Sequence, residues 1–360
     1  MKNIGIITTG GDCSGLNTVI DRIKRGADRR GWHVLGIVDG IDGLSATKPN
    51  VIEINSITAP SEISYLAGSI LRNGNPNRLD YMSDKEGKGN LSKLNTAIKK
   101  SLQKLNLDAL ILIGGNGSLS LTWTTRETYL DVQVICIPKT IDMDVPLTDR
   151  TVGFDTAVQQ LTSFCDQLMM TARSHHRWFV VQSMGRECGQ LALHAGIASG
   201  ASAILIPEIK FNTSDLVKHI QKSDNDFGII MVSEGVKIRG HSGRPADMIA
   251  RELDKNGIAN RTAYPEHLQR SGDTTAPDRI LATQFAECAL SAIENNETYV
   301  MTAIQGNECK TVSMLDVTNA GHGIPDPNIK GLTISASNIE PNNKMLHIAQ
   351  EMGIYVGDVK

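Results

Sequence analysis

The sequence predicts an α/β protein of two doubly wound, Rossmann-like domains, with mainly parallel sheets and an active site in the cleft between them. Three observations support this prediction. Short β-branched runs alternate with amphipathic segments of helical length, and glycine turns connect several of these runs to the segments that follow. The length of 360 residues also exceeds the roughly 100–200 residues of one domain, so two units sharing an interface are expected.

The first series of elements ends before Pro146 and alternates between strand and helix. We predict strands at 4–8, 33–38, 109–113 and 133–137, and helices at about 16–29, 91–105 and 119–128. Because strands that alternate with helices form parallel sheets, we expect helices on both faces of this sheet. The polar segment 71–90, which is rich in Gly and Asn, is expected to be an exposed loop.

The second series begins after Pro146 and repeats the same order. We predict strands at 178–182, 203–206 and 228–232, and helices at 154–171, 189–199 and 213–221. A helix at 277–294 and a strand at 299–304 follow, and this strand could return to the first sheet. We therefore expect discontinuous domains, one formed by 1–150 with about 267–315 and the other by 151–266 with about 316–360.

The composition is that of a globular protein without a strong electrostatic field. Hydrophobic residues make up 40% of the chain, charged residues 21%, and the formal net charge is -3. Such a charge holds neither nucleic acid nor an anionic membrane by itself. No apolar run reaches the ~20 residues of a membrane span, and MKNIGIITT lacks the features of a signal peptide, so a cytoplasmic protein is expected. The 6 cysteines form no CxxC pair and are expected to be reduced thiols.

Two glycine turns follow predicted strands and open predicted helices. TGGDCSGLN, residues 9–17, follows the first strand, and IGGNGSL, residues 113–119, follows the strand at 109–113. Free N–H groups and the helix dipole favour an anion at such a helix N-terminus. One glycine turn alone could be purely structural. Two turns at the carboxyl ends of strands in one α/β sheet favour a polyphosphate ligand.

The segment PKTIDMD, residues 138–144, follows the predicted strand at 133–137 and combines carboxylates, a hydroxyl and an amine. Transfer of a phosphoryl group to a hydroxyl needs a group that accepts the hydroxyl proton and cations that neutralise the transferring oxygens. Asp142 can serve as this base and Lys139 as a cation. Asp142 and Asp144 could instead cap the next helix or pair with arginines.

Single arginines recur at turns and strand ends further along the chain. The planar guanidinium group matches phosphate oxygens, although each arginine could equally be a solvated charge or a salt-bridge partner. Their shared placement near turns keeps a phosphate-binding role open. The residues concerned are Arg177, Arg186, Arg261 and Arg270.

Six motifs, in their order along the chain, resemble those of the phosphofructokinase superfamily of six-carbon sugar phosphate kinases: GGDCSGLN, GGNGS, PKTIDMD, SMGRECGQLA, SEG and HLQRSG. The resemblance spans about residues 2–305. It implies a glycolytic kinase that uses Mg²⁺ and moves the γ-phosphoryl group of ATP to the C1 hydroxyl of fructose 6-phosphate, giving fructose 1,6-bisphosphate. It also implies that the first predicted domain binds the phosphoryl donor and the second binds the sugar phosphate.

The resemblance assigns catalytic roles to single residues. Asp142 would be the base for the C1 hydroxyl, with Thr140 and Asp144 orienting that end of the sugar. Arg186 would steady the transferring phosphoryl group, and Lys139 would supply a further positive charge. The sugar and its 6-phosphate would be bound by Met184, Gly185, Glu234, His267 and Arg270.

The resemblance also implies a homo-oligomer, most commonly a tetramer. In family members, the arginines that match Arg177 and Arg261 reach the sugar 6-phosphate from a neighbouring subunit. A single subunit would then lack part of its acceptor site. The expected ligands are ATP or pyrophosphate and a sugar phosphate, with no nucleic acid and no membrane.

The polyphosphate of the donor would be cradled by Gly11, Gly115, Asn116, Gly117 and Ser118, with a contact from Arg72 or its loop neighbours. Members that use ATP usually carry glycine at the position of Gly117, whereas pyrophosphate users usually carry aspartate. Lys139 resembles the pyrophosphate branch, although some ATP enzymes related to that branch keep lysine. An aspartate at the position of Gly117 would exclude a nucleotide directly by its size and charge. Because glycine stands there, ATP is the expected donor and pyrophosphate the alternative.

Two departures from the family pattern touch the expected site. Asn116 replaces an aspartate that helps to hold Mg²⁺ through its waters, and a neutral amide is a weaker ligand for a hard cation. Asp12 or Asp142 could compensate. Met143 replaces the asparagine that usually separates the two aspartates, which allows another phosphorylated ketose or sugar as the acceptor.

A third departure lies in the effector pocket of bacterial relatives. Asp21 occupies an arginine position, and SDND at 223–226 replaces a lysine-rich stretch, so control by ADP or phosphoenolpyruvate is expected to be absent or altered. A catalytically weak paralogue that binds sugar phosphate or nucleotide is therefore the alternative from a different functional class.

Overall fold

The computed structural model describes residues 1–54, 63–74, 88–129, 131–238, 242–320 and 343–358. These residues form two compact units. The described residues of unit 1 fall within Met1–Thr140, Val145–Gly153 and Asp273–Ile334, and those of unit 2 within Ile141–Asp144, Phe154–Gly272 and Ser335–Lys360. Each unit combines helices with a mainly parallel sheet, so the predicted fold class is confirmed.

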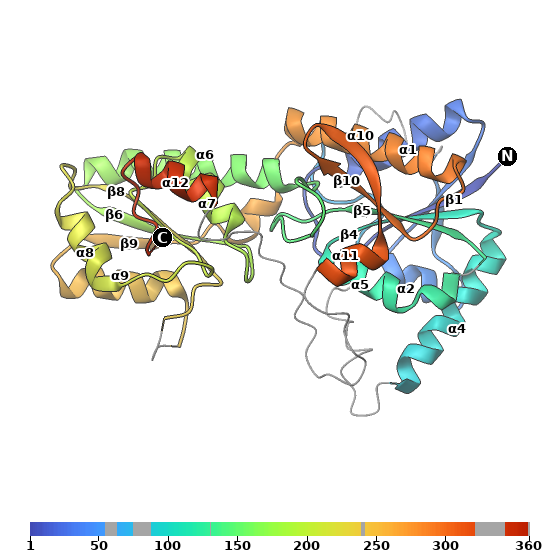
Figure 1. The fold of residues 1–360 in the computed structure, drawn as a ribbon, viewed down its shortest axis with the longest axis horizontal. Helices are drawn as coiled ribbons and strands as arrows, with labels where there is room; N and C mark the ends of the chain where they lie inside the picture. Colours follow the sequence, from blue (N-terminus) through green and yellow to red (C-terminus); the bar gives the residue numbers. More distant parts are fainter. Residues whose placement is uncertain (55–62, 75–87, 130, 239–241, 321–342, 359–360) are drawn as a thin grey trace. The chain divides into compact units, whose positions relative to one another are not determined.

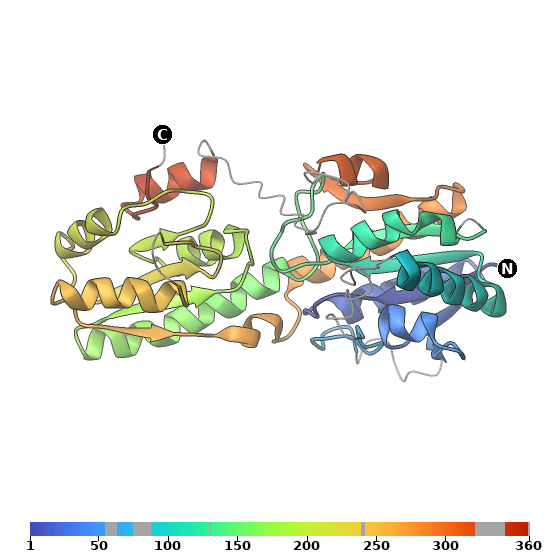
Figure 2. The same cartoon turned by 90° about the horizontal axis from the view of Figure 1, so that it is seen from below.

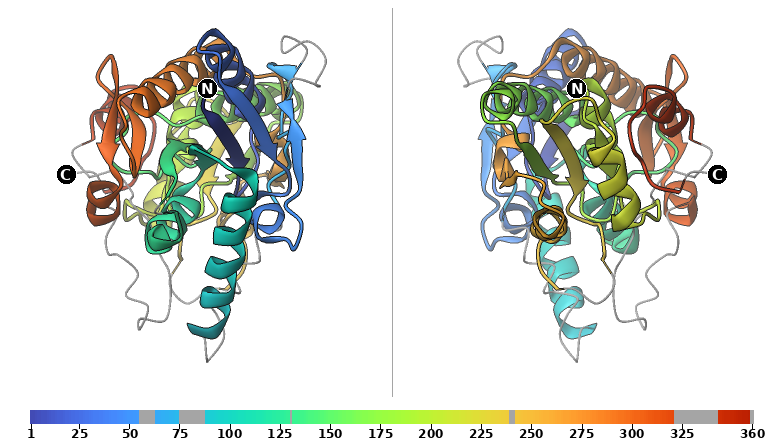
Figure 3. Two further views of the ribbon diagram at one scale, coloured as in Figure 1. Left: turned by 90° about the vertical axis from the view of Figure 1, so that its right-hand side faces the viewer. Right: turned by 90° about the vertical axis from the view of Figure 1, so that its left-hand side faces the viewer.

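Within the described residues, the sheet of unit 1 has seven strands in the order β11-β10-β5-β4-β1-β2-β3. The five central strands are parallel, and the edge strands β3 and β11 run antiparallel to their neighbours. The left-hand view of Figure 3 shows the blue strands β1, β2 and β3 side by side. The strands are β1 (Asn3–Thr8), β2 (His33–Ile37), β3 (Val51–Glu53), β4 (Ala109–Gly114), β5 (Gln133–Pro138), β10 (Val300–Gln305) and β11 (Glu308–Ser313).

Helices cover both faces of this sheet. They are α1 (Leu16–Arg29), α2 (Gly40–Ser45), α4 (Lys88–Leu105), α5 (Asn116–Thr124), the short 3-10 helix η3 (Arg126–Tyr129), α10 (Ala276–Glu294) and α11 (Met314–Ala320). Figure 1 shows α1 and α10 on one face and α2, α4, α5 and α11 on the other, and the view from below in Figure 2 brings α2, α4 and α5 forward. After β1 the chain continues into α1 on one face of the sheet, and after the neighbouring strand β4 it continues into α5 on the other face. Such a place, where neighbouring strands lead to opposite faces, is the switch point at which open α/β sheets bind ligands.

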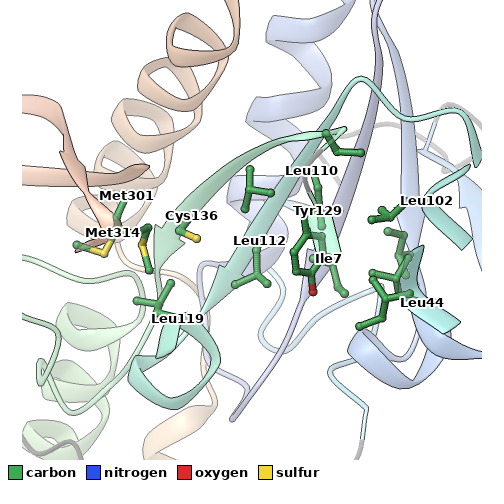
Figure 4. Close-up of a cluster of buried hydrophobic side chains, with 14 of the residues drawn as sticks. Ile7, Leu44, Leu102, Leu110, Leu112, Leu119, Tyr129, Cys136, Met301 and Met314 are labelled. Atoms are coloured by element: carbon green, nitrogen blue, oxygen red, sulfur yellow. The ribbon is translucent and has the colours of Figure 1, made fainter. Parts of the chain in front are cut away.

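The core of unit 1 explains why its central strands lack an alternating pattern. All 6 residues of β4, ALILIG, are buried, as expected for a strand covered by helices on both sides. Figure 4 shows Leu110 and Leu112 of this strand in one cluster with Tyr129 and Cys136. Burial raises the pKa of Tyr129 to about 12 and that of the Cys136 thiol to about 12. Both groups therefore stay neutral and serve as packing side chains.

Unit 2 contains, within the described residues, a four-stranded parallel sheet in the order β7-β8-β6-β9. Its strands are β6 (Trp178–Ser183), β7 (Ala203–Leu205), β8 (Gly228–Ser233) and β9 (Asn260–Ala263). Its helices are α6 (Phe154–Ser174), α7 (Gln190–Ala198), α8 (Thr213–Gln221), α9 (Pro245–Lys255), the 3-10 helix η4 (Glu266–Arg270) and α12 (Lys344–Glu351). Figure 1 shows α6, α7 and α12 on one face of the sheet and α8 and α9 on the other.

The structure corrects several details of the sequence prediction. The predicted helix at 119–128 begins earlier, at Asn116, and ends at Thr124, where a 3-10 turn takes over. Several short or polar elements were not predicted: α2, β3, α9, β9, β11, α11 and α12. The strand at 299–304 does return to the first sheet, where β10 pairs in parallel with β5. Of the loop expected at 71–90, residues 75–87 lie outside the described residues, and α4 begins at Lys88.

The division of the chain also differs from the expected domain limits. Ile141–Asp144 and residues 267–272 fall in unit 2, although they were expected in the first domain, whereas 151–153 and 316–320 fall in unit 1, although they were expected in the second. The physical reason is that η4 packs on α6 of unit 2, and that the carboxylate of Asp142 interacts with charged groups of unit 2. In the part of the chain that the structure describes, no helix has the length and apolar character needed to cross a membrane.

Candidate active site

The two predicted glycine turns meet at the switch point of unit 1. β1 and β4 are parallel neighbours, with Thr8 opposite Ile113, so the turns that follow them leave the sheet at the same edge. Gly10 has a φ of 77°, in the left-handed region that favours glycine. A Cβ at Gly10 would lie 3.2 Å from the Ser118 hydroxyl and 3.9 Å from the Gly115 nitrogen. The hydroxyls of Ser118 and Thr9 are 3.4 Å apart and form a hydrogen bond across the turns.

Lys139 brings the end of a third strand, β5, to the same two turns. Its side chain is 2% exposed, and its ammonium group donates a hydrogen bond to the carbonyl of Gly11. Its backbone N–H donates to the carbonyl of Gly114 at 2.9 Å. Lys139 therefore binds both turns and places a buried positive charge next to them, which favours an anionic ligand.

The start of α5 supplies a helix N-terminus at this place. Gly115 is the N-cap of α5, and Asn116 and Gly117 form its first turn. Apart from Gly117 itself, its two chain neighbours and the nearby backbone of α5, no described atom lies within 4 Å of the position that a Cβ at Gly117 would occupy. The N-terminal N–H groups of a helix attract phosphate, and Gly117 leaves space in front of them.

Arg72 lies at the beginning of the incompletely described loop, next to the first glycine turn. Its carbonyl accepts a hydrogen bond of 2.9 Å from the hydroxyl of Thr8, and the side chain of the next residue, Asn73, donates to the carbonyl of Gly10 at 3.0 Å. The guanidinium group of Arg72 is exposed and lies 3.9 Å from the carboxylate of Asp39. An exposed pair at this distance holds the side chain weakly, which leaves it able to turn to a ligand.

Unit 2 gathers a second group of predicted residues, which we term the carboxylate–arginine cluster: Asp142, Asp144, Arg186, Glu234 and Arg270. The carboxylate of Asp142 is buried and interacts electrostatically with all four of the others. Burial raises the pKa of Asp142 to about 7, the Asp144 and Glu234 carboxylates act in the same direction, and the two arginines oppose them. A carboxyl group that titrates near neutral pH can exchange protons with a substrate.

The turn after β6 presents Arg186 in a fixed conformation. Arg186 has a φ of 53° and Gly185 a φ of 136°, both in the left-handed half of conformational space. A Cβ at Gly185 would lie 2.3 Å from the carbonyl of Cys188, so only glycine fits there. The carboxylate of Glu234 accepts hydrogen bonds from the N–H groups of Gly185 at 3.1 Å and of Arg186 at 2.8 Å.

The 3-10 helix η4 carries two more of the predicted residues, His267 and Arg270. Between them lies Gln269, whose side chain accepts a hydrogen bond of 3.0 Å from the N–H of Met184. Gln269 was not predicted from the sequence, because a neutral glutamine carries neither the proton-accepting group nor the positive charge on which the prediction depended. Its place inside HLQRSG, between two predicted ligands, was the available signal.

Thr140 lies next to the cluster along the chain and is held by its backbone. Its N–H donates to the carbonyl of Val152 at 3.2 Å, and its carbonyl accepts a hydrogen bond of 2.8 Å from the hydroxyl of Thr151. Because consecutive Cα atoms are 3.8 Å apart, the Cα atoms of Lys139 and Asp142 can be at most about 11 Å apart. The chain itself therefore keeps the lysine and the candidate base close together.

Arg177 and Arg261 lie at the other end of the unit 2 sheet. Arg177 directly precedes β6, and Arg261 pairs with Phe179 near the start of that strand, whereas Met184 directly follows its carboxyl end. The seven residue steps from Arg177 to Met184 correspond to about 23 Å of extended chain. Within one chain, these two arginines therefore lie far from the carboxylate–arginine cluster.

Asp21, which was expected to lie in the effector pocket, is paired with two arginines. Asp21 is fully buried and accepts hydrogen bonds from Arg25 at 2.9 Å and from Arg22. These pairs neutralise two arginines that could otherwise meet a phosphate. Glu208 accepts a hydrogen bond of 2.7 Å from the N–H of Gly189. The expectation that control by ADP or phosphoenolpyruvate is absent or altered stays a prediction.

Comparison with known proteins gives matches along nearly the whole chain. Residues 3–293 match the model of the family described as Phosphofructokinase. The chain is 34% identical over 375 residues to an ATP-dependent 6-phosphofructokinase of Chloroflexus aurantiacus, covering 99% of this chain and 98% of that protein. It is 35% identical over 340 residues to a pyrophosphate–fructose 6-phosphate 1-phosphotransferase of Amycolatopsis mediterranei, covering 88% of this chain and 94% of that protein.

The fold has similar solved structures as well. A pyrophosphate-dependent phosphofructokinase from Marinobacter aquaeolei superimposes with a TM-score of 0.78 at 17% identity, covering 99% of this chain and 89% of that chain. At this identity the likeness concerns the fold.

Proposed function

Because the chain belongs to the phosphofructokinase family, we propose that it transfers the γ-phosphoryl group of ATP to the C1 hydroxyl of fructose 6-phosphate, giving fructose 1,6-bisphosphate. It is a phosphotransferase with an alcohol acceptor. The observation that carries the proposal is the buried carboxylate of Asp142, with a pKa raised to about 7, among two arginines and two carboxylates. This is the environment that proton transfer from a sugar hydroxyl requires.

Asp142 acts as the general base in this proposal. Its carboxylate accepts the proton of the C1 hydroxyl as the oxygen attacks the γ-phosphorus, and the bond from that phosphorus to the bridging oxygen of ADP breaks. Asp144 and Thr140 orient the C1 end of the sugar. Arg186, fixed by Glu234, places its positive charge where the transferring oxygens gain negative charge.

The sugar phosphate is bound by unit 2 in this proposal. Arg270 and His267 on η4 bind the 6-phosphate, and Met184 and Gly185 line the sugar. Glu234 can bind a sugar hydroxyl with the carboxylate oxygen that does not hold the Arg186 turn. Arg177 and Arg261, at the opposite end of the sheet, complete the acceptor site of a neighbouring subunit, which makes a homo-oligomer necessary for activity.

ATP is the donor that the glycine turns favour. The space in front of Gly117 leaves room for the α-phosphate of a nucleotide, which an aspartate would exclude by size and charge. Lys139, which resembles the pyrophosphate branch, binds the carbonyl of Gly11 and so holds the first turn in place. Its presence therefore has a structural reason that does not depend on the donor.

Magnesium fits this donor site as an ion that arrives with the nucleotide. Among the described residues, no group of three or more His, Cys, Asp or Glu side chains could hold a metal ion. Mg²⁺ usually keeps several waters and binds substrate phosphates, so it needs few protein ligands. The amide of Asn116 would contribute one neutral ligand. When bound, the ion would neutralise negative charge on the phosphates.

Pyrophosphate is the second candidate donor, favoured by Lys139 and by the pyrophosphate-using relative in the comparison. The deciding experiment is a coupled assay that crosses ATP and pyrophosphate with fructose 6-phosphate and other ketose phosphates. We expect the highest kcat/KM with ATP and fructose 6-phosphate. Faster turnover with pyrophosphate would replace the first proposal by the second, and ligand binding without turnover would indicate a catalytically weak paralogue.

The base itself is tested by Asp142→Asn, which keeps the size of the side chain. We expect kcat to fall by roughly 10²–10⁴-fold, the usual contribution of a general base. Asp166→Asn, at an exposed position of α6 in the same unit, is the matched control. Turnover of Asp142→Asn within about tenfold of the control would exclude Asp142 as the base.

A further inference from the structure

Gln269 joins two parts of unit 2 that the proposed function assigns to the sugar phosphate. It is 1% exposed and is the buried residue of η4, whose neighbouring side chains His267 and Leu268 are exposed. A buried amide is stable only where protein groups replace its hydrogen bonds to water. The position of Gln269 therefore depends on the partners that its side chain finds.

Both ends of the Gln269 side chain have a partner. The Oε1 atom accepts a hydrogen bond of 3.0 Å from the N–H of Met184, in the turn after β6. The Nε2 atom donates to the carbonyl of Glu266 at 2.9 Å, within η4 itself. The side chain thus connects the backbone of η4 to the backbone of the turn, across 85 residues of sequence.

Three consecutive N–H groups of this turn are held by two side chains. Gln269 binds the N–H of Met184, and Glu234 binds those of Gly185 and Arg186. The turn needs such support, since Arg186 adopts a left-handed φ of 53° that costs a non-glycine residue free energy. Glu234 fixes the second half of the turn, and Gln269 fixes the residue at which the turn leaves β6.

We infer that Gln269 is a positioning residue for the sugar phosphate. It sets the distance between Arg270, on the same 3-10 helix, and the Met184–Arg186 turn. This distance lets Arg270 bind the 6-phosphate while the turn binds the sugar ring of the same molecule. This inference rests on the proposed function. Gln269 acts through the turn and through Arg270, and it has no role in proton transfer.

The test compares Gln269→Met with the unsubstituted enzyme. Methionine has a similar size and removes both hydrogen bonds. We expect the KM for fructose 6-phosphate to rise about tenfold, while the KM for ATP and kcat change by less than about threefold. A residue with a merely structural role would instead lower the amount of active enzyme and leave both KM values unchanged.

Amide hydrogen exchange supplies a readout that needs no activity. In Gln269→Met, the amides of Met184, Gly185 and Arg186 are expected to exchange about tenfold faster. Gln221→Met, at the exposed end of α8, makes the same chemical change and is expected to alter neither exchange nor KM. Gln269→Glu keeps the oxygen that accepts from Met184 and loses the group that donates to Glu266. We expect it to give an intermediate KM for fructose 6-phosphate, and it still tests the inference if Gln269→Met does not fold.

The outcomes separate the inference from the proposed function. If neither ATP nor pyrophosphate supports turnover of fructose 6-phosphate by the unsubstituted enzyme, the proposed function fails. Hydrogen exchange of the amides of Met184, Gly185 and Arg186 then still tests whether Gln269 positions the turn. If both Gln269 variants match Gln221→Met in KM for fructose 6-phosphate and in amide exchange, Gln269 does not position the turn.

Discussion

Replacing the candidate base should make the protein more stable as well as inactive. Burial, followed by the like charge of Asp144, raises the pKa of Asp142 from 3.8 to about 7. In the unfolded chain this carboxyl keeps its ordinary pKa, so the folded state binds the proton more tightly. The stability associated with this proton is fully present below about pH 4 and is lost as the pH rises toward 7. Above pH 7 the folded protein carries an unfavourable buried charge, which Asp142→Asn removes.

The size of this effect follows from the two pKa values. With 1.36 kcal/mol for each pH unit between them, the raised pKa of Asp142 lowers stability, relative to a neutral side chain, by roughly 4 kcal/mol at pH 8, where the folded carboxyl is ionised, and by roughly 2 kcal/mol at pH 5, where only the unfolded one is. Asp142→Asn should therefore raise the free energy of unfolding by more at pH 8 than at pH 5, with a difference of roughly 2–3 kcal/mol.

Urea denaturation of the ligand-free protein at both pH values measures this difference. Asp166→Asn, at an exposed position of α6 in the same unit, is the matched control and should change stability by less than about 0.5 kcal/mol at either pH. An equal gain at pH 5 and pH 8, or a loss of stability at pH 8, would refute the conclusion that the site holds a destabilised carboxylate.

Three further predictions concern the donor, the subunits and the unusual turn residue. Gly117→Asp should lower kcat/KM for ATP by about 100-fold and kcat/KM for pyrophosphate by much less, because an aspartate fills the open space in front of α5. Assays of the variant with each donor in turn measure both effects. Mixing inactive Asp142→Asn with inactive Arg177→Ala should restore activity at about a quarter of the sites if subunits exchange at random, because each restored site needs an intact Asp142 from one subunit and an intact Arg177 from its neighbour. No recovery after subunit exchange would argue against shared sites. Met143→Asn should stabilise the protein by about 1 kcal/mol in thermal unfolding, because Met143 has a φ of 53° and asparagine tolerates the left-handed conformation better; an unchanged Tm would contradict this.

The regular part of the fold could be predicted from the sequence, because its strands are short apolar runs that must be buried. Helix α1 was predicted at its observed bounds, and the central strands were placed within about one residue. The elements that were missed lack this signal. β11, for example, contains Lys310 between exposed and half-buried residues and pairs only at the edge of its sheet, and β9 has four residues, one of which is the exposed Arg261.

The site residues were predictable wherever their chemistry is visible in a motif. Asp142 and Arg186 carry charges that suit phosphoryl transfer, and the structure gathers both in one cluster. Gln269 was not predictable in this way, since its contribution consists of two hydrogen bonds to backbone groups that only the folded chain brings together. Lys139 was predicted as a cation of the site, but its hydrogen bond to the carbonyl of Gly11, 128 residues away, was not.

Backbone strain is present at the candidate site as well as elsewhere in the described chain. Of the ten described non-glycine residues with a left-handed φ, three, Arg72, Met143 and Arg186, were predicted from the sequence to touch substrate or to lie within a catalytic motif. Each such residue costs roughly 1–2 kcal/mol and persists only where surrounding contacts enforce it. In the carboxylate–arginine cluster, strain at Arg186 occurs together with a buried carboxylate of raised pKa at Asp142, and selection would remove both from a surface that only packs. This combination favours a chain that still turns over its substrates above one that merely binds them.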